Sequence, residues 1–191
     1  SLIHALGRCI VFVDEADQAL GKRQGGSGDS GVSSRVYSMM AKEMSNTRNR
    51  GKVLWVLASS RPDLIEVDLK RPGRIDVKIP LFPCVSDEQS FALIRALAKR
   101  RGLIIEKDAL DGLRGKLPKL LTPGAAEALA VQLFRVHKTS NLEVMPALEK
   151  CLEVYRPPVK IEILKAQMQL AVEEATDASM IPDEVTEILK D

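Results

Sequence analysis

One stretch of the sequence decides the fold: Arg8-Cys9-Ile10-Val11-Phe12-Val13-Asp14-Glu15-Ala16-Asp17. Its unbroken run of apolar, mostly β-branched residues is typical of a central parallel strand that is buried on both faces. Two adjacent acids, Asp14 and Glu15, follow at the carboxyl end, which is where open α/β sheets place their ligand chemistry. Burial of neighbouring carboxylates is costly unless a cation or a proton transfer uses them. The residues alone leave a second interpretation open, in which both acids only cap the following helix.

The composition is that of a soluble globular protein. The 191 residues are 45% hydrophobic and 28% charged, with a net charge of +2. This near-neutral balance gives no electrostatic reason to expect a nucleic-acid or membrane surface as partner. Cys9, Cys84 and Cys151 are widely separated, which favours free thiols in a reducing compartment, so we expect a cytoplasmic location. His4 and His137 have no clustered partners, no zinc site is expected, and no apolar run reaches membrane-spanning length.

Two further strands are expected downstream, over residues 53–58 and 75–81. The first ends at Ser59-Ser60, so polar groups again follow the carboxyl end of a strand. Between the two strands, Arg71 and Arg74 flank a Pro-Gly pair. Such a pair fixes a tight turn and holds both arginine side chains in place.

The rest of the chain has helical periodicity. We expect helices over residues 18–20, 32–44, 87–101, 107–117, 123–137, 146–155 and 159–176, and a last one from about residue 181. Residues 1–7 have the pattern of the end of a helix. Four glycines fall within residues 24–31, which predicts a surface loop; it lacks the Gly-Lys-Ser/Thr ending of a P-loop.

Three separated segments resemble AAA+ ATPases in order and spacing. Residues 9–23 resemble the Walker B segment. Residues 54–83, with Arg71-Pro72-Gly73-Arg74, resemble the second region of homology that marks the classical AAA clade. The helical remainder is similar to the lid subdomain, and Thr122-Pro123-Gly124-Ala125-Ala126-Glu127 lie at the position of the small-residue sensor-2 turn.

The resemblance implies an α/β fold: a partial parallel P-loop-type sheet with flanking helices, followed by an α-helical lid. Residues 1–84 would be the C-terminal part of the large subdomain, 85–157 the lid and 158–191 a helical extension. The Walker A segment of the family would precede residue 1. Its strand normally separates the strands expected at 53–58 and 75–81. Without it we expect an exposed apolar face, and self-association or less cooperative unfolding.

The resemblance also implies a role for each site residue. Asp14 would hold Mg²⁺ through water, and Glu15 would be the general base that polarises the attacking water. Ser60 falls where the family usually has the sensor-1 asparagine. Arg71 and Arg74 match two arginine fingers that act on the nucleotide of the neighbouring subunit, a contribution of roughly 10³–10⁵ in rate.

The remaining implications concern the nucleotide and the assembly. Gly124 and Ala125 would contact ATP from the sensor-2 turn, and the glycine-rich loop would be a second pore loop. The resemblance implies a ring-shaped oligomer, expected to be a hexamer, that hydrolyses ATP to remodel or unfold a macromolecule, most naturally a protein. This chain by itself would be inactive, because the β- and γ-phosphates have no cradle.

Two alternatives stay open. Because Ser60 reaches less far than an asparagine and makes fewer hydrogen bonds, the chain could be a degenerate AAA scaffold that binds nucleotide or a partner without turnover. The residues Asp14-Glu15-Ala16-Asp17 also spell the DEAD box of RNA helicases. Only Ala58-Ser59-Ser60 loosely matches a further helicase motif, and the near-neutral charge lends that interpretation no support.

Overall fold

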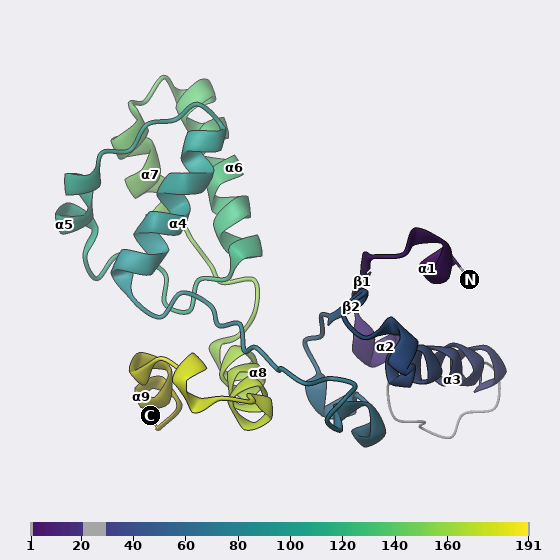
Figure 1. Ribbon diagram of the computed structural model, residues 1–191. Coiled ribbons are helices and arrows are strands. Elements are labelled where there is room, and N and C mark those ends of the chain that lie inside the picture. Colours follow the sequence, from purple (N-terminus) through teal and green to yellow (C-terminus); the bar gives the residue numbers. More distant parts are fainter. Residues whose placement is uncertain (1, 21–29, 191) are drawn as a thin grey trace. The chain divides into compact units, whose positions relative to one another are not determined.

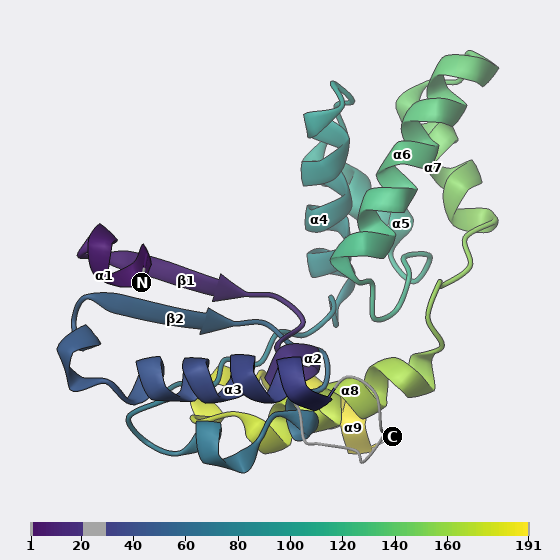
Figure 2. The same ribbon diagram turned by 90° about the vertical axis from the view of Figure 1, so that its right-hand side faces the viewer.

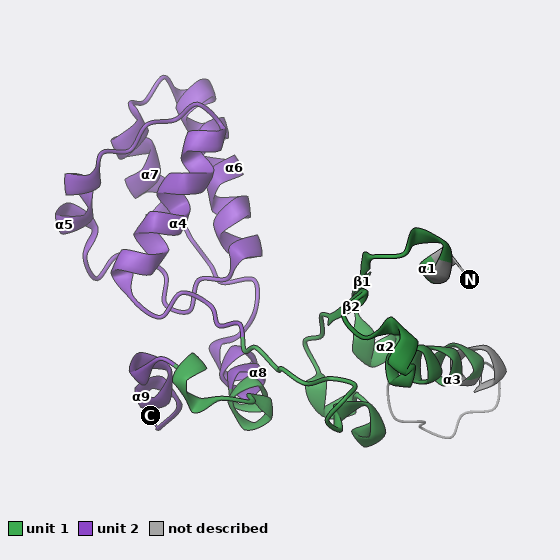
Figure 3. Ribbon diagram, in the orientation of Figure 1, with its two compact units in different colours: residues 1–80, 169–181 green, residues 81–168, 182–191 purple. Residues whose placement is uncertain are grey.

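The computed structural model describes residues 2–20 and 30–190. The chain divides into two compact units, unit 1 (Ser1–Pro80 with Gln169–Ile181) and unit 2 (Leu81–Met168 with Pro182–Asp191), coloured separately in Figure 3. Most of the glycine-rich loop expected to be a pore loop lies outside the described residues. The division expected from the sequence, into 1–84, 85–157 and 158–191, stays a prediction.

Unit 1 is built on a parallel pair of strands, β1 (Cys9–Val13) and β2 (Val53–Leu57). They pair in register from Cys9 opposite Val53 to Val13 opposite Leu57. Helices α1 (Leu2–Leu6), α2 (Ala16–Leu20) and α3 (Ser30–Ser45) precede or connect them, and Figure 2 shows α3 running alongside the strands. The parallel α/β fold expected from the sequence is confirmed.

The sheet is buried on one face. Alternate side chains of both strands, including Val13 and Trp55, pack on a core formed by α2, α3 and the segment before the Arg-Pro-Gly-Arg turn. The other face presents four apolar side chains that pair across the strands, Ile10 with Leu54 and Phe12 with Val56. Their exposed fractions are 70%, 59%, 62% and 39%, respectively. Burial on both faces was therefore wrong for the described residues, because their helices cover only one side of the sheet.

The strand expected at residues 75–81 is also absent, since that segment has no regular secondary structure. A strand requires a neighbouring strand for its main-chain hydrogen bonds. Here the amide of Ile75 instead donates to the carbonyl of Leu69 at 3.1 Å, and Lys78 is bonded to Thr176. The alternating apolar pattern that predicted the strand is thus left without a ladder in the described part of the chain.

Two short 3₁₀ helices follow β2. They comprise η2 (Pro62–Leu64) and η3 (Val67–Lys70). Another, η1 (Thr47–Asn49), leads into β2 and contains the buried Asn49, whose side-chain amide donates to the carbonyl and a carboxylate oxygen of Glu43, both at 3.0 Å.

Unit 2 is a helical domain, whose helices Figure 1 shows, and it has its own hydrophobic core. Helix α6 (Pro123–Ser140) packs against both α4 (Asp87–Arg100) and α7 (Val144–Glu153). Ser86 and Thr122 cap α4 and α6, each accepting a main-chain N–H three residues on at 3.3 Å. The helix expected at 107–117 is shorter, comprising η4 (Lys107–Ala109) and α5 (Leu110–Leu113).

The C-terminal part contains α8 (Ile161–Glu174), η5 (Ala178–Met180) and α9 (Asp183–Lys190). The first turns of α8 are assigned to unit 2, and its last residues, with the segment up to Ile181, to unit 1. This return of the chain to unit 1 was not anticipated from the sequence.

Candidate active site

The two acids of the opening stretch occupy a sharp turn between β1 and α2. Glu15 has a φ of +48°, a left-handed conformation that is uncommon outside glycine. Two hydrogen bonds of 2.9 Å hold the turn beside the end of β2: Ala16 N–H donates to the carbonyl of Ala58, and Ala58 N–H donates to the carbonyl of Val13. The turn therefore continues the strand pairing past both strand ends and fixes Asp14 and Glu15 at the carboxyl edge of the sheet.

The chemistry of this edge suits a hydrated cation. Both acidic side chains are exposed, and Oδ1 of Asp14 accepts the main-chain N–H of Glu15 at 2.9 Å. No cluster of three or more metal-binding side chains occurs in the residues described. Mg²⁺ does not need one, because it commonly keeps several waters and binds through one or two carboxylates together with substrate phosphates. Asp14 therefore fits a water-mediated Mg²⁺ contact.

The end of β2 contributes a serine pair to the same edge. The hydroxyl of Ser59 donates to Oδ1 of Asp17 at 2.5 Å and accepts the N–H of Arg61 at 2.9 Å. This cross-link ties α2 to the exit of β2, and the next residue, Ser60, is exposed. The pair of Asp17 and Ser59 was missed from the sequence, since 42 residues separate them and only the strand pairing brings them together.

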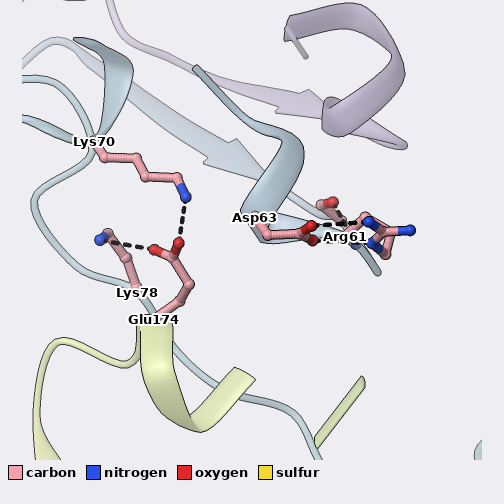
Figure 4. Close-up of polar contacts among 6 residues, drawn as sticks. Arg61, Asp63, Lys70, Lys78 and Glu174 are labelled. Carbon is pink, nitrogen blue, oxygen red and sulfur yellow. Dashed lines mark hydrogen bonds and ion pairs between the residues drawn. The ribbon is translucent and has the colours of Figure 1, made fainter. Parts of the chain in front are cut away.

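A bidentate ion pair follows directly. Nε and Nη2 of Arg61 donate to the two carboxylate oxygens of Asp63 at 2.9 and 2.8 Å, as Figure 4 shows. The hydrogen bond from Arg61 lowers the pKa of Asp63, and the same bond raises the pKa of Arg61. Arg61 is therefore engaged within its own turn, which leaves Ser60 as the exposed polar group nearest the strand end.

The Arg-Pro-Gly-Arg turn holds its two arginines differently. Arg74 is fixed, because its Nε donates to the hydroxyl of Ser45 at 2.8 Å and its Nη1 to the carbonyl of Asp68 at 2.9 Å. Arg71 makes one ion pair, with Asp68 at 3.1 Å, and its side chain is 71% exposed. Gly73 has a φ of +85°, which only glycine adopts without strain, so the turn depends on it. Arg71 is thus available to a group outside its own unit.

The structure brings some of the predicted site residues together. Asp14, Glu15 and Ser60 share the carboxyl edge of the β1–β2 pair. None of the hydrogen bonds or ion pairs found in the described residues joins Arg71 or Arg74 to these three.

Gly124 and Ala125 belong to the other unit, in the first turn of α6. The N–H of Ala125 donates to the hydroxyl of Thr122 at 3.3 Å, so the cap already uses it. Gly124 is exposed, and an added Cβ there would meet nothing within 4 Å. A close approach of backbone to ligand is therefore possible at Gly124, whereas the amide of Ala125 is occupied.

Comparison with known proteins agrees with this geometry. The profile of the ATPase family associated with various cellular activities (AAA) matches residues 2–82. Residues 2–82 belong to the AAA family. The match contains both strands, the acidic turn and the Arg-Pro-Gly-Arg turn, so the AAA resemblance seen in the sequence is confirmed.

Individual relatives extend the similarity. The chain is 32% identical over 100 residues to peroxisomal ATPase PEX6 of Dictyostelium discoideum, which covers 52% of this chain and 8% of that protein. It is 40% identical over 75 residues to the cell division cycle protein 48 homolog of Archaeoglobus fulgidus, covering 39% of this chain and 10% of that protein. It is 29% identical over 149 residues to the ATP-dependent zinc metalloprotease FtsH of Mycobacterium tuberculosis, covering 76% of this chain and 19% of that protein. The chain thus spans less than a fifth of the length of each of these relatives.

The AAA segment is followed by helices that could not cross a membrane. Within residues 2–20 and 30–190, no helix combines the length and apolar character that a membrane span requires.

Proposed function

We propose that the AAA segment is the hydrolytic half of an ATPase that works as a ring, expected to be a hexamer, and uses ATP and Mg²⁺ to remodel or unfold a protein. The observation that carries this proposal is the strand register, which places an acid pair and a serine at one sheet edge inside a segment that matches the AAA family. We further propose that this work takes place in the cytoplasm.

Each residue at the edge then has a chemical task. Asp14 binds Mg²⁺ through water, and the metal supplies charge neutralisation at the phosphates. Glu15 accepts a proton from the attacking water, which requires that its carboxylate reach that water, and its side chain is exposed at the sheet edge. Ser60 orients that water through its hydroxyl. In this proposal the Asp-Glu-Ala-Asp tetrapeptide is the end of a Walker B segment and not a helicase box.

The remaining residues complete the site from elsewhere. Arg71 and Arg74 stabilise charge on the nucleotide of the neighbouring subunit, and Gly124 with Ala125 approaches the nucleotide from the first turn of α6. The 191 residues contain no Gly-Lys-Ser/Thr sequence. We therefore propose that this chain by itself turns over little ATP, because the phosphates lack their cradle.

Glu15→Gln in a full-length chain that carries a phosphate-binding loop tests the proposal. Hydrolysis should fall by about 10²-fold or more, the scale of general-base catalysis, while ATP binding and ring assembly persist. Glu173→Gln is the matched control, since Glu173 is an exposed glutamate of α8 whose hydrogen bond, of 2.9 Å, comes from Gln169 in the same helix. Equal loss in both variants would contradict the base assignment.

The same experiment addresses the scaffold alternative, which the short side chain of Ser60 favours. If the parent chain binds ATP without turnover, Glu15→Gln will change neither ATP hydrolysis nor ATP binding. In that case, Ser60→Asn should restore hydrolysis when the serine is the missing element, because the amide reaches further and offers both donors and an acceptor.

A further inference from the structure

Glu174, the last residue of α8, connects two lysines that flank the Arg-Pro-Gly-Arg turn. Its Oε1 accepts a hydrogen bond from Nζ of Lys70, and its Oε2 accepts one from Nζ of Lys78 at 3.1 Å. Figure 4 shows both lysines pointing at this one carboxylate. Lys70 ends η3 immediately before Arg71, so the contacts lie at the two ends of the loop of residues 70–78.

Two further hydrogen bonds, both with Thr176, hold the loop at Lys78. The N–H of Lys78 donates to the hydroxyl of Thr176 at 2.7 Å, and the N–H of Thr176 donates back to the carbonyl of Lys78 at 3.2 Å. The segment that follows α8 therefore engages the main-chain N–H and carbonyl of Lys78, groups that a strand would use for pairing. Glu174 and Thr176 together form a clamp, which we call the C-terminal clamp.

The ion pairs of the clamp are partly shielded from water. The side chains of Lys70, Glu174 and Lys78 are 13%, 23% and 31% exposed. Burial raises the pKa of Glu174, but the hydrogen bonds from Lys70 and Lys78 outweigh that effect and leave the pKa below its usual value. Charge-assisted bonds in such a setting are stronger and more directional than exposed ion pairs.

Arg71 depends on this clamp more than Arg74 does. The side chain of Arg74 has its own contacts, with Ser45 and with the carbonyl of Asp68. Arg71 has the solvent-exposed pair with Asp68, and such a pair restrains a long side chain weakly. The position of the Arg71 side chain is consequently set by its backbone. Lys70, the residue directly before Arg71, is held by Glu174.

We propose that Glu174 is a positioning residue for Arg71: by fixing both ends of the loop of residues 70–78, it aims Arg71 at the nucleotide of the neighbouring subunit. This inference rests on the proposed function, because it requires that Arg71 acts across a subunit boundary. It adds a role for the end of α8, which lies outside the matched AAA segment.

Glu174→Gln in the full-length ring is the first test. It removes the charge, keeps the shape, and should lower kcat about 10- to 100-fold, the effect expected when a positioned group shifts by about 1 Å. The KM for ATP should change less than about threefold, since the arginine acts in the transition state. Glu173→Gln, on the same helix and hydrogen-bonded by Gln169 of that helix, should leave both constants unchanged.

Mixed rings provide the decisive readout. A Glu174→Gln subunit keeps its own Glu15 but aims its arginine poorly, whereas a Glu15→Gln subunit is inactive but supplies an intact Arg71 to its neighbour. Mixtures of the two should therefore exceed the activity of either variant alone. A Glu174 that only stabilised its own subunit would give no more than the weighted average.

A mixture of Arg71→Ala and Glu15→Gln subunits tests the shared arginine separately from the positioning role of Glu174. If this mixture shows no gain, the shared arginine of the proposed function is wrong. If it gains activity and the Glu174→Gln mixture does not, the clamp is not a positioning device. Should Glu174→Gln fail to assemble, Lys78→Met, which removes the more exposed lysine of the clamp, must show the same complementation or the inference is overturned.

Discussion

The exposed face of the β1–β2 sheet leads to a quantitative prediction about association. Burying a Val, Leu, Ile or Phe side chain completely contributes about 1.5–3 kcal/mol. The exposed fractions of Ile10, Phe12, Leu54 and Val56, from 39% to 70%, leave the equivalent of about two such side chains per copy. Two copies meeting face to face would thus gain about 10 kcal/mol, against an association cost of at least about 4 kcal/mol. With a cost of about 4 kcal/mol, the remaining 6 kcal/mol corresponds to a dissociation constant of about 40 μM.

Ile10→Lys should weaken this association strongly. The substitution removes about 1–2 kcal/mol of burial per copy, or about 2–4 kcal/mol per pair, which weakens the dimer at least about 30-fold. Sedimentation velocity of the 191-residue chain from about 1 μM to 1 mM spans the wild-type dissociation constant, whereas the variant, at about 1 mM or weaker, should stay mostly monomeric over this range. Ile104→Lys is the matched control, because Ile104 is 72% exposed but belongs to unit 2.

Two results would refute the reasoning about this face. One is a wild-type chain that stays a monodisperse monomer at the highest concentration and unfolds in a single sharp transition. The other is an equal loss of association in Ile104→Lys, which would show that association does not depend specifically on the exposed sheet face.

Two further predictions concern stability. Leu129→Ala, in the core of unit 2 at 2% exposure, should lower the free energy of unfolding by about 2–5 kcal/mol in urea denaturation, whereas Val131→Ala, 39% exposed on the same helix, should cost less than about 1 kcal/mol. Because Lys70 and Lys78 hold the pKa of Glu174 below 4.5, the clamp stabilises the fold fully above that pH and loses its contribution as the pH falls through the lowered pKa. The stability difference between wild type and Glu174→Gln should accordingly shrink between pH 6 and about pH 3; a constant difference would contradict the ion-pair account.

Local patterns in the sequence predicted most of the elements. The apolar run before Asp14 gave β1, the run before Ser59 gave β2, and helical periodicity gave the unit 2 helices to within a few residues. These elements were predictable because their signals, such as the Ser86 cap of α4, lie within the segments that form them. The acid pair and the serine could be placed at one edge for the same reason, since parallel strands end together.

The contacts that depend on distant residues were decided by the tertiary structure alone. Residues 75–81 have the alternation of a strand but form none, because an apolar pattern does not specify a pairing partner. Burial of one sheet face likewise depends on which helices cover it. Glu174 lies 104 residues from Lys70 and 96 from Lys78, and no local feature of a glutamate at a helix end reveals two lysines so far away. The sequence by itself determined strands β1 and β2 and most of the helices, whereas the tertiary structure decided that residues 75–81 form no strand and that the end of α8 contacts both ends of the arginine loop.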